Sequence, residues 1–199
     1  MRRAFVYLAV AAAGVALGLG SALWLAGLWP AASKMAFGNV NVGGWRSDFT
    51  TGSEAADPYT RARVARHGLL ALAKTEAVYF SRTDDDAGEP LREACSYRLS
   101  GGVMPAGWWS VTLYDAKSML PANTDDALSV DAEQMGAGAW SAIIAPERPA
   151  GGGAWISSRG AGVFDLTLRL YMPKPALLAQ PDAALVSPRI ERLSCEGEQ

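Results

Sequence analysis

The sequence predicts a mainly β domain with an antiparallel core and one short helix, preceded by a transmembrane helix at the N-terminus. Two stretches, 108–115 (WWSVTLYD) and 164–171 (FDLTLRLY), place an apolar side chain at every second position, as half-buried strands do. We expect these two strands to pair with each other. The chain also contains 21 glycines and 11 prolines, which suits strands joined by turns better than a helical bundle.

The N-terminal segment supplies the membrane prediction. Residues 4–29 carry no charge and follow Arg2 and Arg3, and roughly 20 apolar residues are enough for a helix to cross a bilayer. Basic residues before such a helix favour an N-terminus in the cytoplasm and a domain on the far side. The alternative is a signal peptide cleaved near 31–33 (Ala-Ala-Ser). Both interpretations export the domain.

The remaining chain has room for one domain. A chain of 199 residues fits one membrane segment plus a domain of roughly 150 residues. We divide it into an anchor or uncleaved signal over 1–30, a juxtamembrane segment over 31–57 and a β domain over 58–199. The juxtamembrane segment is expected to contain one short strand within 39–46.

The short helix is predicted to begin at Asp57, which would cap its N-terminus, with Pro58 as the first helical residue. It is expected to end near Ala73. Its predicted buried stripe consists of Ala62, Ala65, Leu69 and Leu72.

The other side of this helix is basic, carrying Arg61, Arg63, Arg66 and His67. We interpret it as a solvated outer face, and contact with anionic lipid headgroups is the alternative.

Residues 76–101 are predicted to form a β-hairpin, with one strand at 77–83 and the other at 95–101. The connecting loop contains Asp84, Asp85 and Asp86, but it lacks the ligand spacing of a calcium loop. With one histidine and two distant cysteines in the chain, a zinc site is excluded as well, unless carboxylates dominate it. We therefore predict no metal site and no cofactor, since phosphate- and dinucleotide-binding motifs are also missing.

Cys95 and Cys195 are the two cysteines of the chain. In an oxidising compartment we expect them to form a disulfide that ties the C-terminal tail to a core strand. Closing a loop of about 100 residues contributes up to about 5 kcal/mol of stability. Two free thiols are the alternative.

The net charge and the lack of a catalytic motif argue against nucleic-acid binding and against a catalytic triad. The formal net charge is −2, which gives no field to attract nucleic acid. His67 is the single histidine, and no nucleophile motif accompanies it, so a catalytic triad is not expected.

The polar side of the predicted sheet is the candidate binding surface. Aromatic rings beside arginine and hydroxyl groups can hold a sugar or another polar ligand, whereas the same residues also occur on an ordinary outward sheet face. The candidate binding residues are Arg98, Thr112, Tyr114, Thr167, Arg169 and Tyr171.

Two carboxylates are weak catalytic candidates. Asp115 ends one predicted strand and Asp165 begins another, and glycoside hydrolysis needs two acids in one cleft. The simpler interpretation is that Asp115 opens a turn and Asp165 lies on a solvated face.

Several segments, taken in order, resemble a bacterial family known as domain of unknown function 1214. The resemblance covers about 40–195 and rests on VGGWRSD, DPYTRARVARHGLLAL, EAVYF, CSYRLSGG, PAGWWSVTLYDA, LPAN, WIS and FDLTLRLYMP. It implies a β-sandwich of jelly-roll type, located here at a bacterial inner membrane with the domain in the periplasm. The family offers no catalytic residues to carry over. It often follows a companion domain, number 1254, so a separate companion protein is an expected partner.

These observations predict a membrane-anchored envelope module that binds or assembles without catalysis, with a glycan or a lipid as its ligand. One alternative is a carboxylate-dependent hydrolase of envelope carbohydrate, which requires Asp115 and Asp165 to lie within about 10 Å in one cleft. The other is a subunit of a small membrane complex, for which an exposed apolar patch would be the sign.

Overall fold

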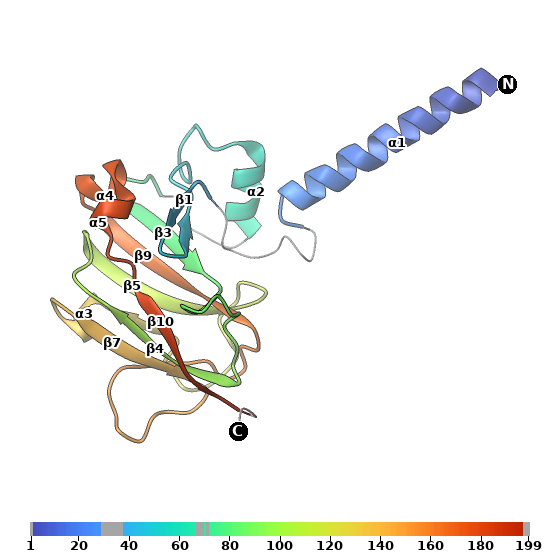
Figure 1. Cartoon of the computed structure of the whole chain (residues 1–199). Coiled ribbons are helices and arrows are strands. Elements are labelled where there is room, and N and C mark those ends of the chain that lie inside the picture. Colours follow the sequence, from blue (N-terminus) through green and yellow to red (C-terminus); the bar gives the residue numbers. More distant parts are fainter. Residues whose placement is uncertain (1, 29–37, 67–69, 71, 197–199) are drawn as a thin grey trace.

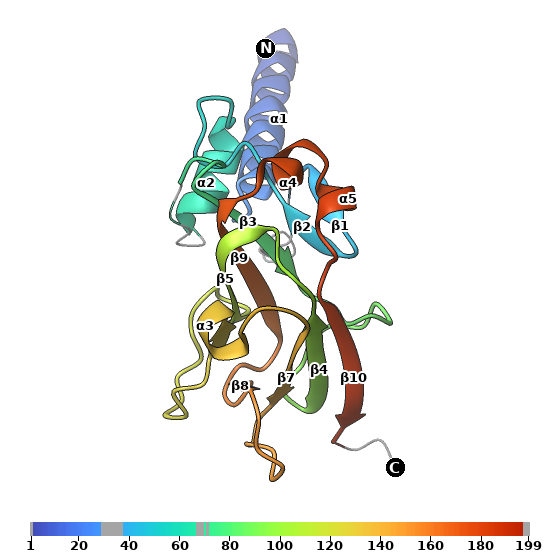
Figure 2. The ribbon, with the colours of Figure 1, turned by 90° about the vertical axis from the view of Figure 1, so that its left-hand side faces the viewer.

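Two β-sheets packed face to face make up most of the protein, and an N-terminal helix extends away from them (Figure 1). The computed structural model describes residues 2–28, 38–66, 70 and 72–196. The predicted fold class is confirmed, because the chain is mainly β, its few domain helices are short, and the sheets form a sandwich-like pair (Figure 2).

The larger sheet has six strands in the order β1-β2-β3-β9-β5-β6. Its neighbouring strands are all antiparallel. The strands are β1 (Val40–Val42), β2 (Trp45–Ser47), β3 (Ala77–Arg82), β9 (Phe164–Pro173), β5 (Ala106–Asp115) and β6 (Ser129–Asp131).

The smaller sheet has four strands in the order β10-β4-β7-β8. Its strands are β10 (Arg189–Cys195), β4 (Cys95–Gly101), β7 (Trp140–Ala145) and β8 (Trp155–Ser157). β7 and β8 run parallel, which departs from a purely antiparallel sandwich.

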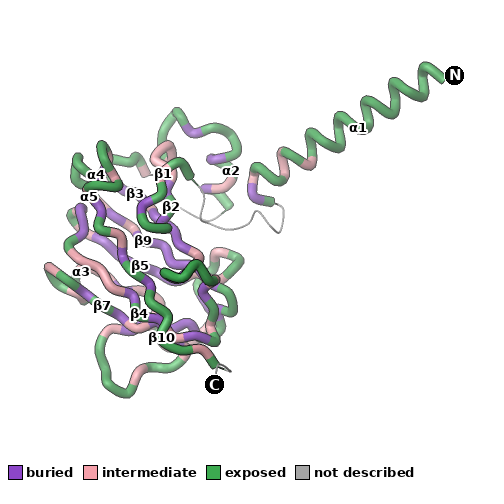
Figure 3. The backbone as a smooth tube through the Cα atoms, in the orientation of Figure 1, coloured by how far each residue is buried: buried purple, intermediate pink, exposed green. Residues whose placement is uncertain are grey.

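The predicted pairing of the two long strands is confirmed. β5 and β9 are antiparallel neighbours, with Val111 opposite Leu168 and Leu113 opposite Leu166. All four side chains are completely buried, and each contributes about 1.5–3 kcal/mol through burial. Figure 3 shows the buried stretches on the strands of both sheets.

The hairpin predicted over 76–101 does not form. β3 pairs with β2 and β9 in the larger sheet, whereas β4 pairs with β10 and β7 in the smaller one. The connection between them crosses from one sheet to the other. Strand alternation reports which face of a strand is buried, but it does not report which sheet the strand joins, and this explains the error.

The predicted helix is present as α2 (Pro58–Arg66). Asp57 caps it, because its carboxylate accepts hydrogen bonds from the backbone N–H groups of Tyr59 and Thr60 at 2.8 and 3.2 Å. The predicted buried stripe is wrong. Thr60 and Val64 are buried, whereas Ala62 and Ala65 are exposed.

The predicted length of this helix is also wrong, because Leu70, Leu72 and Ala73 are not helical. Ala73 lies four positions before Ala77, where the chain already runs extended as β3, so the helix has to end before it. His67 and Leu69 lie outside the described residues.

The N-terminal helix α1 (Arg2–Leu25) has no buried residues. Its length and apolar composition would allow it to cross a membrane, and a signal sequence has the same properties. Residues 31–33, the alternative cleavage region, lie outside the described part of the chain.

The juxtamembrane segment contains two short strands where one was expected. β1 and β2 form a hairpin across Gly43 and Gly44, whose positive φ angles of 57° and 88° favour glycine. Trp45 is fully buried, and its indole N–H donates to the Pro188 carbonyl at 2.7 Å. This hairpin is therefore fixed to the segment that precedes β10.

The C-terminal strand is joined to the smaller sheet by a covalent bond. Cys195 lies opposite Cys95 in the register of β10 and β4, and the two residues form a disulfide. Three further short helices complete the fold, namely α3 (Ala132–Met135), α4 (Pro175–Ala179) and α5 (Pro181–Ala184).

Candidate functional site

The outer side of the larger sheet carries a continuous set of polar and aromatic side chains, which we call the polar face. Residues opposite each other in adjacent strands point to the same side of a sheet, so the register of β3, β9 and β5 defines its members. They are Tyr79, Ser81, Trp108, Ser110, Thr112, Tyr114, Asp165, Thr167, Arg169 and Tyr171.

Five of the six predicted binding residues lie on this face. Arg98 does not. It belongs to β4 in the other sheet, where its exposed side chain forms an ion pair with Glu191 at 2.9 Å. Its strand has the same alternation as β5 and β9, but it lies in the other sheet, so the prediction that Arg98 shares a face with the other five residues is wrong.

Arg169 is the positively charged residue at the centre of the polar face, and Arg46 of β2 lies on the same side of the sheet, opposite Ser81. Its guanidinium donates to the Thr112 hydroxyl at 2.7 Å and to the Tyr114 hydroxyl, and it lies over the Tyr114 ring at 5.4 Å from the centroid. These three contacts involve neutral groups. Among the described ion pairs none includes Arg169.

Aromatic rings surround this arginine. Trp108 and Tyr171 meet edge to face with 5.4 Å between centroids. The Tyr79 hydroxyl donates to the Leu70 carbonyl at 3.0 Å, and burial followed by the neighbouring Tyr171 raises the pKa of Tyr79. The rings therefore present flat apolar surfaces that also carry polar groups.

The hydroxyl groups of the polar face are more buried than an outward sheet face would be. Thr167 is 0% exposed and lies with its hydroxyl 3.4 Å from that of Ser81, while Ser110 is buried next to Arg169 in the register. Sequence reasoning missed Ser81, Ser110, Trp108 and Tyr79. Their alternating positions in β3 and β5 were the available signal.

Asp165 is the second charged group of the polar face, and it is 6% exposed. Its Oδ1 atom is buried without a hydrogen-bond partner. Burial, followed by the negative charge of Asp115, raises the pKa of Asp165 to about 7. The interpretation of Asp165 as part of a solvated face is therefore wrong.

Asp115 opens a turn. Its carboxylate accepts hydrogen bonds from the backbone N–H groups of Lys117 and Met119 at 2.8 and 2.9 Å. It lies opposite Phe164 in the register, one position beyond the pair formed by Tyr114 and Asp165. Asp115 is thus close enough to affect the titration of Asp165 while its own carboxylate holds the turn.

The run Asp84 to Asp86 binds arginines. Asp84 and Asp86 both contact Arg82, at 3.4 and 3.1 Å. Asp86 also pairs with Arg189, and Asp85 pairs with Arg192. Within the described residues, no group of three or more histidine, cysteine, aspartate or glutamate side chains could hold a metal ion.

Comparison with known proteins adds a family and a fold. A family model described as "Protein of unknown function (DUF1214)" matches residues 76–175. The structure is similar to that of the VPA0106 protein from Vibrio parahaemolyticus, with a TM-score of 0.58 and 19% identity over 94% of this chain and 45% of that chain.

An uncharacterised protein from Burkholderia cenocepacia is similar at a TM-score of 0.48 and 16% identity, over 77% of this chain and 35% of that one. The chain thus spans less than half the length of either solved structure. No curated protein matches the chain.

Proposed function

The chain belongs to the DUF1214 family of proteins of unknown function, and from that premise we propose that it is a membrane-anchored binding module of the cell envelope. We propose further that its polar face binds a glycan that carries an acidic group, and that it does so without catalysis.

The observation that supports this most strongly is the environment of Arg169. Its side chain is half-buried, and its described partners are the neutral hydroxyls of Thr112 and Tyr114. Removing a charge from water is costly unless an opposite charge compensates it. A guanidinium has five N–H donors and matches carboxylate and phosphate oxygens well. An acidic ligand would supply the missing countercharge.

The neighbouring groups suit a sugar. Trp108 and Tyr171 lie one row along the sheet from Arg169 and offer apolar ring surface. Ligand sites commonly combine aromatic walls with a few polar groups that fix orientation. Asp131, at the β6 end of the Arg169 row, caps α3, because its Oδ1 accepts hydrogen bonds from the N–H groups of Glu133 and Gln134.

Catalysis by the two carboxylates is less well supported. A raised pKa beside a second acid is the pattern of a general acid in glycosidases, and Asp165 has this pattern. However, Asp165 is almost completely buried and Asp115 is held by the turn after β5. A glycosidic oxygen needs direct access to the acid that protonates it.

The proposed topology follows from α1. Its length and composition support a single span, with Arg2 and Arg3 on the cytoplasmic side and the β domain in the periplasm of a bacterial inner membrane.

A companion subunit is a second proposal, and one observation favours it. The VPA0106 chain extends well beyond the matched part, since this chain covers 45% of it. A separate protein that supplies an equivalent companion domain would form a small membrane complex with this chain. Affinity purification of the full chain from its native membrane, followed by identification of copurified proteins, tests this proposal.

The glycan proposal is tested by binding measurements on the full chain in lipid nanodiscs. Isothermal titration would compare uronate-containing oligosaccharides with neutral ones of equal length. We expect the wild type to prefer the acidic set, and we expect Arg169→Met to weaken that binding at least tenfold. Arg169→Lys keeps the charge but loses the planar guanidinium, so its affinity for the acidic set should lie between those of the wild type and Arg169→Met.

Arg98→Met is the matched control, because it also removes a strand arginine but in the other sheet. It should bind as the wild type does. Equal affinity of Arg169→Met and the wild type, or no preference of the wild type for acidic glycans, would overturn the proposal.

A further inference from the structure

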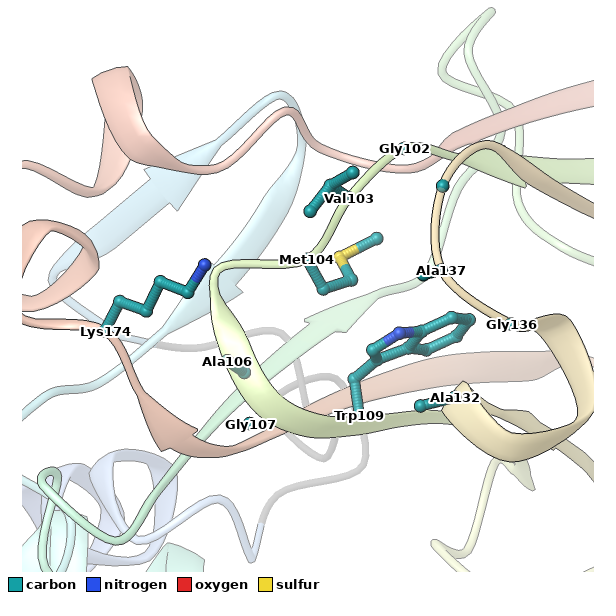
Figure 4. Close-up of a pocket in the computed structure, with 11 residues that line it drawn as sticks. Gly102, Val103, Met104, Ala106, Gly107, Trp109, Ala132, Gly136, Ala137 and Lys174 are labelled. Atoms are coloured by element: carbon teal, nitrogen blue, oxygen red, sulfur yellow. The ribbon is translucent and has the colours of Figure 1, made fainter.

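We infer that a second site, a cavity at one end of the sandwich, binds a small carboxylate with an apolar body. The cavity has a volume of about 300 Å³ and lies among the β4–β5 turn, the start of β5, the segment after α3 and the residue that precedes α4 (Figure 4). We call it the Lys174 cavity. It lies at the strand ends, apart from the row of Arg169.

The indole of Trp109 forms the floor of the cavity, and a second tryptophan, Trp140, stacks against it. Trp109 and Trp140 stack with 4.5 Å between centroids and 28° between planes, and the Trp140 indole N–H donates to the Gly102 carbonyl at 3.0 Å. A side chain on Gly101 would lie 2.5 Å from the Trp140 ring. The floor is therefore fixed in place before any ligand arrives.

The walls consist of backbone and of small or apolar side chains. Met104 and Ala106 line one side, and Ala132, Gly136 and Ala137 line the other, as Figure 4 shows. Gly136 has a φ of 71°, which favours glycine, and a Cβ placed on it would meet nothing within 4 Å. This sequence of small residues keeps the space above Trp109 open.

Lys174 is the single charged residue among those that line the cavity. Its backbone N–H donates to the Pro105 carbonyl at 2.8 Å, which fixes its position next to the β4–β5 turn. Lys174 is exposed, and Figure 4 shows its ammonium beside the loop that carries Met104 and Ala106, with the Trp109 ring on the other side of that loop in this view. One positive charge at one end and an apolar floor at the other match a ligand with one negative charge and an apolar body.

The volume limits the size of this ligand. A water molecule occupies about 30 Å³ in the liquid, so the cavity equals about ten waters, at the lower end of the range for small-molecule sites. A monocarboxylate such as hexanoate or cyclohexanecarboxylate, with about nine non-hydrogen atoms, would fill it.

The test uses the full chain in nanodiscs, with empty nanodiscs as the blank, and titration calorimetry with cyclohexanecarboxylate. The wild type should bind the acid at least tenfold more tightly than cyclohexanol. Lys174→Met should weaken binding of the acid at least tenfold and leave binding of the alcohol within twofold. Lys117→Met, which removes an exposed lysine from the connection after β5, should behave as the wild type does.

A second variant tests the cavity itself. Ala137→Leu places a larger side chain on the wall, and it should weaken binding of the acid and the alcohol alike. A wild type that does not bind the acid, or that binds acid and alcohol equally, would overturn the inference. So would Lys174→Met that retains the full affinity for the acid. None of these outcomes affects the glycan proposal, because Arg169 is not part of this cavity.

Discussion

Two regions of the molecule differ in whether their charged side chains form ion pairs. In the connection that crosses from β3 towards β4, each aspartate faces an arginine. The ion pairs are Arg82–Asp84, Arg82–Asp86, Arg189–Asp86 and Arg192–Asp85, with N···O distances of 3.0–3.4 Å. On the polar face, Arg169 contacts hydroxyl groups and Asp165 has an unpaired buried oxygen.

The difference indicates two different roles. The paired charges link the crossing connection to β10, so they stabilise the fold. Because they already bind each other, few of their hydrogen-bonding groups are free for a ligand. On the polar face, the half-buried Arg169 without a countercharge and the buried Asp165 oxygen without a hydrogen bond cost folding free energy. Groups that lower stability and make no compensating structural contact are frequently found at binding sites.

The two regions also titrate in opposite directions. Burial raises the pKa of Asp86, but the Ile190 backbone N–H, Arg189 and Arg82 outweigh that effect and hold the pKa below its usual value. The pKa of Asp165 is raised to about 7. Asp86 therefore contributes stability that is lost as the pH falls, and Asp165 contributes stability that is lost as the pH rises.

The largest effect is expected from breaking the paired region. Arg82→Ala should lower the free energy of unfolding by about 3 kcal/mol or more, because it removes the buried member of this ion-pair network and takes a donor from the buried Asp85 carbonyl. The Arg82 side chain is 7% exposed and also donates to the Asp85 carbonyl at 2.7 Å. Chemical denaturation measures this. Arg98→Ala, which breaks an exposed pair, should cost about 0–1 kcal/mol, and equal losses in both variants would contradict the contrast.

An effect that depends on pH is expected from Asp165→Asn. Wild-type stability should fall as the pH rises from about 4 to about 7, because the folded state keeps a proton that the unfolded state releases. The asparagine variant should not show this fall. At pH 8 it should be more stable than the wild type by on the order of 3 kcal/mol.

Denaturation curves at pH 4, 6 and 8 check this prediction, with Asp126→Asn as the control. Asp126 is exposed, and asparagine tolerates its positive φ of 50°. The control should follow the wild type at every pH. A constant difference between Asp165→Asn and the wild type would show that Asp165 does not hold a proton in the folded state.

The smallest effect is expected from Arg169→Met. Removing an unpaired cation leaves no orphaned charge behind, and the lost hydrogen bonds to Thr112 and Tyr114 are offset by the cation's own desolvation cost. We expect a change of about 1 kcal/mol or less in the free energy of unfolding. A loss as large as that of Arg82→Ala would assign Arg169 to the structural framework and remove the basis of the glycan proposal.

The sequence was informative where local pattern decides structure. The alternation in 108–115 and 164–171 predicted both the strands β5 and β9 and their pairing, because each needs a buried partner for one face. The cap at Asp57 was also predictable from local sequence, since an aspartate followed by proline suits the first turn of a helix.

The sequence did not predict features that depend on contacts between segments far apart in the chain. Alternation could not tell that β3 and β4 join different sheets, and so Arg98 was grouped with a face that it does not share. The burial of Asp165 depends on what surrounds β9, and no local pattern records that. The Lys174 cavity joins residues from the β4–β5 turn, the segment after α3 and the end of β9, which only the folded chain brings together.

The position of β10 has a consequence for how the protein is made. This strand is the last element of the chain, and it pairs with β4, which is synthesised about 90 residues earlier. Until β10 has been synthesised and has paired, one edge of β4 keeps its backbone N–H and C=O groups unpaired. An open edge of this kind invites pairing with other chains. The edge of β4 is therefore open to aggregation until β10 pairs with it, and the bond between Cys95 and Cys195 then holds β10 in place.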